Sequence, residues 1–163
     1  MSRIATRQDA VKLPESQVHL SQAGEVLTSL IVPVIRLEAY FSRAGETIAA
    51  AGGQTLARWL VLESVAAAPA TVAQTARELG YTRQSVQRVA DLLEQDGLTQ
   101  YAHNPAHQRS QLVRITPLGR KTLSTIQRAQ RSWADRVGGQ IGEADLRQAS
   151  AVVDKLTRIL KAQ

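Results

Sequence analysis

The sequence contains no cysteine, and this absence excludes several kinds of chemistry. Disulfide bonds, thiolate metal sites and regulation by thiol oxidation all require a cysteine side chain. Of the three histidines, His103 and His107 are four residues apart, but Pro105 between them prevents the helix that would bring them together. The chain also has no glycine-rich phosphate loop and no H-E-x-x-H motif. We therefore expect no enzyme activity, no metal and no cofactor.

Aromatic residues are scarce as well, at 4% of the chain with a single phenylalanine. Proteins that bind single-stranded DNA or RNA usually stack the bases on exposed aromatic rings. Tyr81 and Tyr101 are the only aromatic residues between positions 71 and 119, and we expect them to flank the exposed face of that segment. If the protein binds a nucleic acid, this scarcity favours a duplex.

Long apolar runs are missing too. No run approaches the ~20 residues of a membrane span, and the N-terminus has no apolar signal core. We expect a cytoplasmic protein that does not enter a membrane. With 163 residues, 44% of them hydrophobic, the chain is long enough for one compact domain or two joined lobes.

Charge is distributed unevenly along the chain. Acidic and basic side chains balance over residues 1–76, so the net charge of +6 belongs to the remainder. A basic half favours a polyanionic partner, although charge by itself is only supporting evidence.

Residues 71–119 contain the pattern of two helices joined by a tight turn. A first helix ends at Leu79, and Gly80-Tyr81-Thr82 forms a three-residue turn. Thr82 is a suitable N-cap for a second helix, and Gly97 is a suitable stop after it. The second helix has one apolar face, formed by Val86, Val89, Ala90 and Leu93.

The opposite face of this second helix carries long hydrogen-bond donors and amides. Such side chains read the edges of guanine and adenine, whereas an ordinary surface helix more often carries Glu and Lys there. The expected contacts with DNA from this helix are Thr82, Arg83, Gln84, Ser85, Gln87 and Arg88, with Asp91 on the same face.

A β-ribbon is predicted after the second helix. Residues 98–102 and 111–116 are β-prone, and a polar loop around Asn104-Pro105-Ala106 separates them. The loop region carries His103, His107 and Arg109, and a basic tip suits phosphate or minor-groove contact. Thr116-Pro117 then begins another helix. The fold class is therefore mainly α with a small β-wing.

These pieces together resemble the MarR family of winged-helix transcription regulators. The resemblance lies in VAQTARELGYTRQSVQRVADLLEQDGL, in the wing and its closing ITPLG, and in the upstream LARWLVLESVAAAP. It implies that Arg109 contacts DNA beside the minor groove. In the family an acidic residue usually stands two positions before this arginine and braces the loop, but here that position is His107. His107 is therefore expected either to add charge to the tip or to be an ordinary solvated histidine.

The resemblance also implies a site for a small aromatic or lipophilic effector between a dimerisation lobe and a DNA-binding lobe. The candidate residues are Tyr40, Arg58 and Trp59. The alternative for Trp59 is simple packing in a helical core, which is what large aromatic side chains most often do.

Both ends of the chain carry apolar residues at helical spacing. One seam runs from Leu27 to Ile48 and another from Leu146 to Leu160. Either could close the core of a single protomer, but they present more apolar surface than a small winged helix covers, so we favour a homodimer. Pro33 is expected to bend or break the first helix, and Gly138-Gly139 to end a helix over 117–137.

The sequence thus predicts the following division of the chain. Residues 1–20 form an N-terminal arm, residues 21–52 and 117–163 a helical dimerisation lobe, and residues 53–116 a winged helix-turn-helix. The predicted function is a homodimeric regulator, of the repressor type, that a small molecule releases from a pseudo-palindromic operator in double-stranded DNA. The alternative is a winged helix that binds another protein and no DNA.

Overall fold

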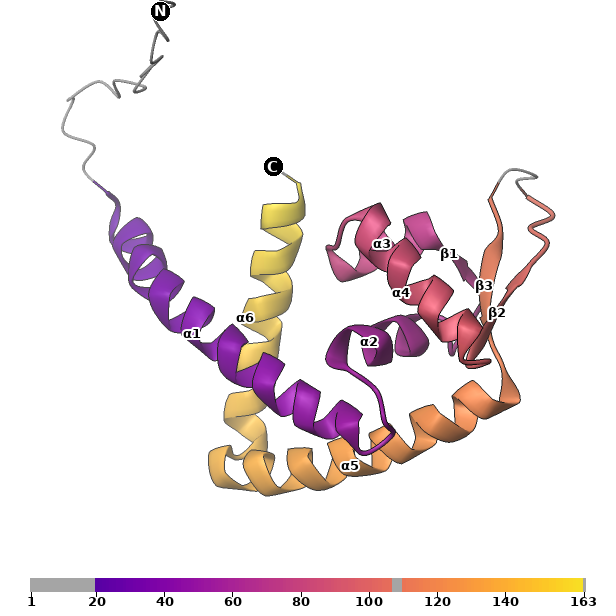
Figure 1. Cartoon of the computed structure of the whole chain (residues 1–163). Helices are drawn as coiled ribbons and strands as arrows, with labels where there is room; N and C mark the ends of the chain where they lie inside the picture. Colours follow the sequence, from indigo (N-terminus) through magenta and orange to yellow (C-terminus); the bar gives the residue numbers. More distant parts are fainter. Residues whose placement is uncertain (1–19, 107–109, 163) are drawn as a thin grey trace, which may run out of the picture. The chain divides into compact units, whose positions relative to one another are not determined.

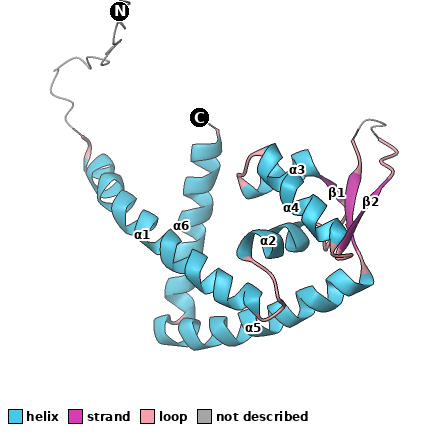
Figure 2. Cartoon of the chain, viewed as in Figure 1, coloured by secondary structure: helices cyan, strands magenta, loops and turns pink. Residues whose placement is uncertain are grey.

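The computed structural model describes residues 20–106 and 110–162. The chain divides into two compact units between Ala39 and Tyr40. Along the described residues the elements are α1 (Gln22–Ala50), α2 (Leu56–Ser64), β1 (Ala70–Thr71), α3 (Val72–Leu79), α4 (Arg83–Gln95), β2 (Thr99–Ala102), β3 (Leu112–Ile115), α5 (Pro117–Ile141) and α6 (Glu143–Lys161) (Figure 1). Helices with one small antiparallel sheet make up the fold, as predicted (Figure 2).

Within the first unit, α1 begins at a serine cap. The Ser21 hydroxyl accepts a hydrogen bond of 3.1 Å from the backbone N–H of Gly24. The helix then continues through Pro33, so the break that we considered at this proline does not occur. Most large apolar side chains in this part of α1 are exposed: Val26, Leu27, Leu30, Ile31, Val32, Val34, Ile35 and Leu37.

In the second unit, α2, α3, α4 and α5 each begin at a threonine cap. The hydroxyls of Thr55, Thr71, Thr82 and Thr116 each accept from a backbone N–H in the first turn of the following helix. At Thr71 the cap is reciprocal, because the Gln74 side chain accepts from the backbone N–H of Thr71 at 2.8 Å. Caps of this kind define where each helix starts, and they were readable in the sequence at Thr82 and Thr116.

A single apolar core holds α2, α3, α4, the sheet and the first half of α5 together. Its members come from every one of these elements and from the end of α1. The fully buried apolar side chains with the largest volume are Leu62, Leu93, Ile126, Val61, Val65 and Val86. Trp133 of α5 packs against this core, and its ring contacts that of Phe41 edge-on, with ring centroids 6.0 Å apart.

The sheet has three strands in the order β1-β3-β2, and all pairs are antiparallel. In the ribbon, Thr99 pairs with Ile115 and Ala102 with Leu112, so the two predicted strands are confirmed to within a residue at each end. The third strand, β1, was not predicted. Its two residues pair with Val113 and Leu112 of β3, and nothing in so short a segment distinguishes it from a loop.

Helix α5 is longer than predicted. It runs through Gly138 and Gly139 to Ile141, and the chain turns at Gly142, so the predicted stop at Gly138-Gly139 is wrong. Gly142 has a φ of 98°, a backbone conformation that side-chain-bearing residues rarely adopt. The other two glycines only lower the helix propensity. Helix α6, which follows directly, buries none of its residues. Among the described residues, no helix is long and apolar enough to cross a membrane.

Candidate nucleic-acid interface

The position of α4 follows from its two ends. Gly80, at a φ of 71°, makes the sharp turn out of α3, and Thr82 caps α4 through a 3.2 Å bond from the Ser85 N–H. At the other end Asp96 closes the helix and Gly97 has a φ of 70°. Both ends lie where the sequence predicted them.

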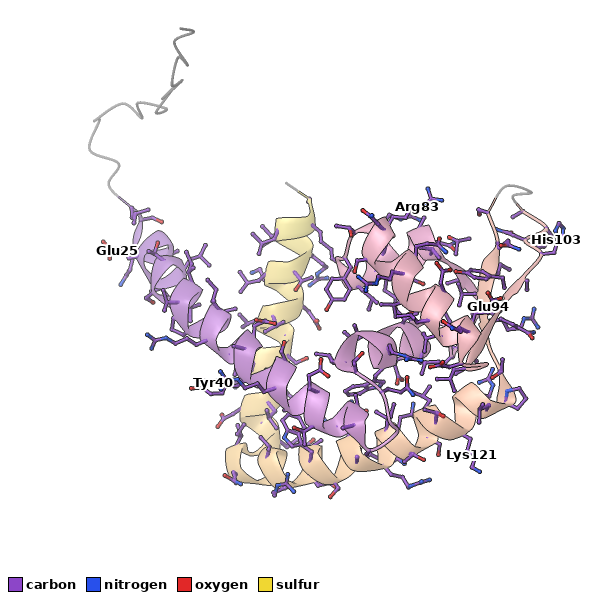
Figure 3. All side chains as sticks on the ribbon, viewed as in Figure 1. Glu25, Tyr40, Arg83, Glu94, His103 and Lys121 are labelled. Carbon is purple, nitrogen blue, oxygen red and sulfur yellow. The ribbon has the colours of Figure 1, made fainter. Side chains whose placement is uncertain are left out.

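One face of α4 anchors the helix and the other is open. Val86, Ala90 and Leu93 are buried in the core, and Val89 is half-buried against it. The predicted DNA contacts Thr82, Arg83, Gln84, Ser85 and Arg88 are exposed, whereas Gln87 is half-buried. Figure 3 shows Arg83 pointing away from the protein at the start of the helix. The structure therefore brings these donors together on one rigid, outward-facing surface.

Gln87 differs from its neighbours because it takes part in a hydrogen-bond network. Its Nε2 donates to Asp91 Oδ1 at 2.8 Å and to the Tyr101 hydroxyl oxygen at 2.7 Å. The Tyr101 hydroxyl in turn donates to Asp91 Oδ1 at 2.6 Å. We refer to Gln87, Asp91 and Tyr101 as the clamp. It joins α4 to β2, and a fourth contact, from the Tyr101 N–H to Glu94 Oε1 at 3.1 Å, reinforces the same connection.

The clamp keeps the Tyr101 hydroxyl protonated. Burial, followed by the hydrogen bond to Asp91 and the negative charge of that residue, raises the pKa of Tyr101 above its ordinary value of 10.0. Sequence reasoning placed Tyr101 beside the exposed face and missed the clamp. The i,i+4 spacing of Gln87 and Asp91 was visible, but no local pattern indicated that the ribbon would bring Tyr101 to them.

In the loop that follows β2, Asn104 is buried and hydrogen-bonded to other loop residues. This residue is only 7% exposed. Its Oδ1 accepts from the Ala106 N–H at 3.0 Å, and its Nδ2 donates to Ser110 Oγ at 3.4 Å. His103 is exposed at the outer edge of the ribbon (Figure 3). The predicted contacts His107 and Arg109 lie outside the described residues.

Two hollows border the exposed face of α4. One of about 370 Å³ is lined by Gln84, Gln87, Arg88, Asp91, Leu92 and Gln95. A second, of about 150 Å³, lies between α4, the start of α3 and the ribbon, and is lined by Thr71, Val72, Ala73, Arg83, Gln87, Tyr101, Ser110 and Gln111. Gln87 is the residue common to both, so it stands where the helix surface meets the wing.

The three predicted effector residues have different environments. Trp59 is buried in the core at 8% exposure, and its Nε1 donates to Glu63 Oε2 at 3.2 Å. Arg58 forms an ion pair with Asp96 at the end of α4. Tyr40, in contrast, is exposed, and its ring lies 5.9 Å from the guanidinium carbon of Arg43 (Figure 3). Among the described residues, no group of three or more His, Asp or Glu side chains is placed to hold a metal ion.

Comparison with known proteins agrees with this geometry. A family model described as the MarR family matches residues 53–110. An uncharacterized protein of Mycobacterium tuberculosis (strain ATCC 25618 / H37Rv) is 36% identical over 140 residues, which are 86% of this chain and 98% of that protein.

Solved structures show the same fold. The crystal structure of MarR family transcription regulator SP03579 superposes with a TM-score of 0.74 at 22% identity, covering 85% of this chain and 92% of that one. Staphylococcus aureus MarR, in complex with salicylate and kanamycin, gives 0.74 at 14% identity, covering 85% and 95%. The M. tuberculosis transcriptional regulator MOSR, in complex with DNA, gives 0.64 at 18% identity, covering 79% and 96%.

Proposed function

Because this chain belongs to the MarR family of transcription regulators, we propose that it binds an operator in double-stranded DNA as a homodimer and acts as a repressor that a small molecule releases. Its family and its structural neighbours are regulators and not enzymes. A regulator that works on an operator must reach the chromosome, so the proposal includes a cytoplasmic location. It also keeps residues 53–116 as the DNA-binding lobe and residues 21–52 and 117–163 as the dimerisation lobe.

The observation that carries the DNA-binding proposal is the exposed face of α4. Arg83, Gln84 and Arg88 project from a helix whose opposite side is buried in the core, so their backbone positions are fixed before any ligand binds. Arg and Gln side chains form the common bidentate contacts with guanine and adenine in the major groove. The related regulator MOSR is known in complex with DNA, which is consistent with this role.

Dimerisation is supported by what α6 leaves exposed. Its large apolar side chains Val152, Val153, Ile159 and Leu160 are all exposed, and none of its residues is buried. Monomeric soluble proteins rarely expose extended apolar patches, so a partner that covers this face is expected. A second copy is the simplest partner, because two-fold symmetric homodimers are the commonest oligomers and a pseudo-palindromic operator requires two recognition helices.

For release by an effector, Arg58 offers a physical route. Its guanidinium joins α2 to the C-terminal end of α4 through Asp96. An anionic effector that bound the guanidinium in place of Asp96 would release the C-terminal end of α4. The orientation of α4, the proposed recognition helix, could then change. Salicylate, which is bound in the related S. aureus MarR, is the probe of choice. Calorimetric titration should show binding to the wild type and weaker binding to Arg58→Ala.

Selection of duplexes from a random pool by the pure protein tests the main proposal. We expect a pseudo-palindrome with half-sites about one helical turn, ~34 Å, apart. Affinity should fall steeply with salt, because each lysine or arginine contact with phosphate releases counterions. Light scattering at micromolar concentration should give the mass of two chains. If no duplex binds even at low salt, a winged helix that binds another protein becomes the better account.

A further inference from the structure

The clamp uses every hydrogen that the Gln87 side chain can donate. A glutamine amide has two N–H donors on Nε2 and one acceptor oxygen, Oε1. The two acceptors are only 2.6 Å apart, so both bonds bend, with one hydrogen directed to Asp91 Oδ1 at 2.8 Å and the other to the Tyr101 hydroxyl oxygen at 2.7 Å. No donor is left on Nε2 for a further ligand.

The orientation of the amide follows from its partners. The Tyr101 hydroxyl already donates its only hydrogen to Asp91 Oδ1, at 2.6 Å, so toward Gln87 it can act only as an acceptor. An ionised Asp91 carboxylate is likewise only an acceptor. If the amide were rotated by 180°, Oε1 would face two acceptors and both bonds would be lost. The nitrogen must therefore face the clamp.

Oε1 is then the atom of Gln87 that remains available. Among the described residues it has no hydrogen-bond partner, and Gln87 lines both hollows beside the exposed face of α4. We propose that Gln87 reads the major groove through Oε1 alone, as a hydrogen-bond acceptor, and that its partner is an exocyclic amino group of adenine or cytosine. This inference rests on the DNA-binding function proposed above.

The proposal departs from the usual behaviour of glutamine. A free glutamine binds adenine through two bonds, accepting from the N6 amino group and donating to N7. Gln84, three residues earlier on the same helix, is exposed and has no side-chain hydrogen bond among the described residues, so it keeps both capabilities. Gln87 could donate to N7 only by giving up a bond of the clamp. The bond to Asp91 is charge-assisted and thus stronger than a neutral bond to N7. Release of the bond to Tyr101 would leave the hydroxyl oxygen of a half-buried side chain without its donor, so we expect the clamp to be retained.

The state of Tyr101 supports the same assignment. Burial and the neighbouring Asp91 raise the pKa of Tyr101, and its hydroxyl stays protonated throughout the neutral range. The Tyr101 hydroxyl therefore continues to donate to Asp91, and its oxygen continues to accept from Gln87. In this arrangement Asp91 and Tyr101 are positioning residues, and Gln87 is the side chain that touches the base.

Base analogues in the selected operator test the proposal directly. The position read by Gln87 is the one at which Gln87→Ala loses base selectivity. At an adenine, an analogue without the N6 amino group should weaken wild-type binding about threefold to tenfold, whereas 7-deaza-adenine should bind like adenine. At a cytosine, removal of the N4 amino group should have the same cost, and 7-deaza-guanine in the paired strand should have none. A comparable loss with either 7-deaza base overturns the proposal.

The variant Tyr101→Phe provides the second arm. It frees one hydrogen of Gln87, so sensitivity to the 7-deaza base should appear and selectivity at this position should broaden. Tyr81→Phe, which removes a hydroxyl from an exposed tyrosine in the turn before α4, is the matched control and should behave like the wild type. Thermal melting of both variants checks that the fold is retained. If Tyr101→Phe leaves both selectivity and 7-deaza sensitivity unchanged, the clamp does not set the chemistry of Gln87.

The possible failures are distinguishable. A protein that binds no duplex at all contradicts the proposed function, and this inference falls with it. A protein that binds and selects its operator, but whose Gln87→Ala variant loses selectivity at no position, contradicts only the inference.

Discussion

The winged-helix region and α6 contain similar proportions of apolar residues and use them differently. In the winged helix, apolar side chains of α2, α3, α4, the sheet and α5 are buried against each other within one chain. Helix α6 has a comparable set of valines, leucines and isoleucine but buries none of its residues. Isolated helices are only marginally stable in water and depend on packing of their apolar face. The first region is complete within one chain, whereas the apolar face of α6 is available to the second copy that we propose.

Helix α1 shows the same contrast along its own length. In its last turns Gly45, Ile48 and Ala49 are buried, and a Cβ on Gly45 would lie 2.8 Å from Leu56 Cδ1. Earlier in the helix the apolar side chains are exposed. Helical periodicity is the same in both parts, so periodicity identifies an apolar face without saying what covers it.

The largest effect is expected from a charge placed on the exposed apolar face of α6. Val153→Asp would bury a carboxylate without a partner in the proposed dimer, which costs several kcal/mol, so dimer affinity should fall by more than about a hundredfold. Light scattering checks the mass, and operator binding should be lost with the dimer. Ala151→Asp adds the same charge about 160° around the helix, on the side of Arg147 and Arg158, and should leave the dimer intact. A stable dimer of Val153→Asp at micromolar concentration contradicts the assignment.

Helix α5 has one glycine packed against the winged helix, Gly119, and one near α6 with no neighbour, Gly139. A Cβ on Gly119 would lie 2.1 Å from the backbone oxygen of Leu98 and 2.8 Å from Ile115 Cγ1, whereas one on Gly139 meets nothing within 4 Å. Gly119→Ala should lower the free energy of unfolding by about 3 kcal/mol, since the backbone must move. Gly139→Ala should raise it by about 0.5–1 kcal/mol through its better helix propensity. Urea unfolding measures both. Equal effects of the two substitutions would be inconsistent with the packing described.

Within the winged helix, α4 and the wing should contribute differently to DNA binding. Arg88→Ala removes a donor from the exposed face of α4. The binding free energy for the operator should therefore weaken by roughly 1–3 kcal/mol, and the difference in affinity between operator and random DNA should become smaller. Arg109→Ala should weaken binding to operator and to random duplex more evenly. It should also reduce the slope of log affinity against log salt concentration by about one unit. Titrations of operator and random duplex at several salt concentrations separate the two patterns. Wild-type behaviour of both variants would favour the protein-binding alternative.

The smallest effect concerns stability at alkaline pH. Above the ordinary pKa of 10.0, Tyr101 loses its proton in the unfolded chain but keeps it in the folded one, because the folded pKa is raised. The unfolded state then binds fewer protons, so the free energy of unfolding falls as pH rises through this range. The loss should stay below about 1 kcal/mol by pH 11, since solvent still partly screens this half-buried group. Urea unfolding from pH 8 to 11 should show the decline in the wild type and in Tyr81→Phe but not in Tyr101→Phe.

Most of the winged helix was predictable because its signals are local. Thr82 as a cap, Gly97 as a stop and the apolar stripe of α4 each act over a few residues, and the structure has all of them as predicted. The stop at Gly138-Gly139 was wrong because glycine merely weakens a helix, whereas the positive φ that ends α5 falls at Gly142. Strand β1 escaped prediction because two residues carry no periodicity.

The candidate site divides in the same way. The amino-acid sequence by itself determined which side chains stand on the exposed face of α4, since a helix with a fixed apolar face has only one outward direction. Only the tertiary structure decided what those side chains are free to do. Tyr101 lies 14 residues after Gln87 and reaches it through the ribbon, and Asp96 reaches Arg58 across 38 residues. Hydrogen bonds are directional and consume donors, so a partner brought in by the fold changes the chemistry of a residue whose position was already known.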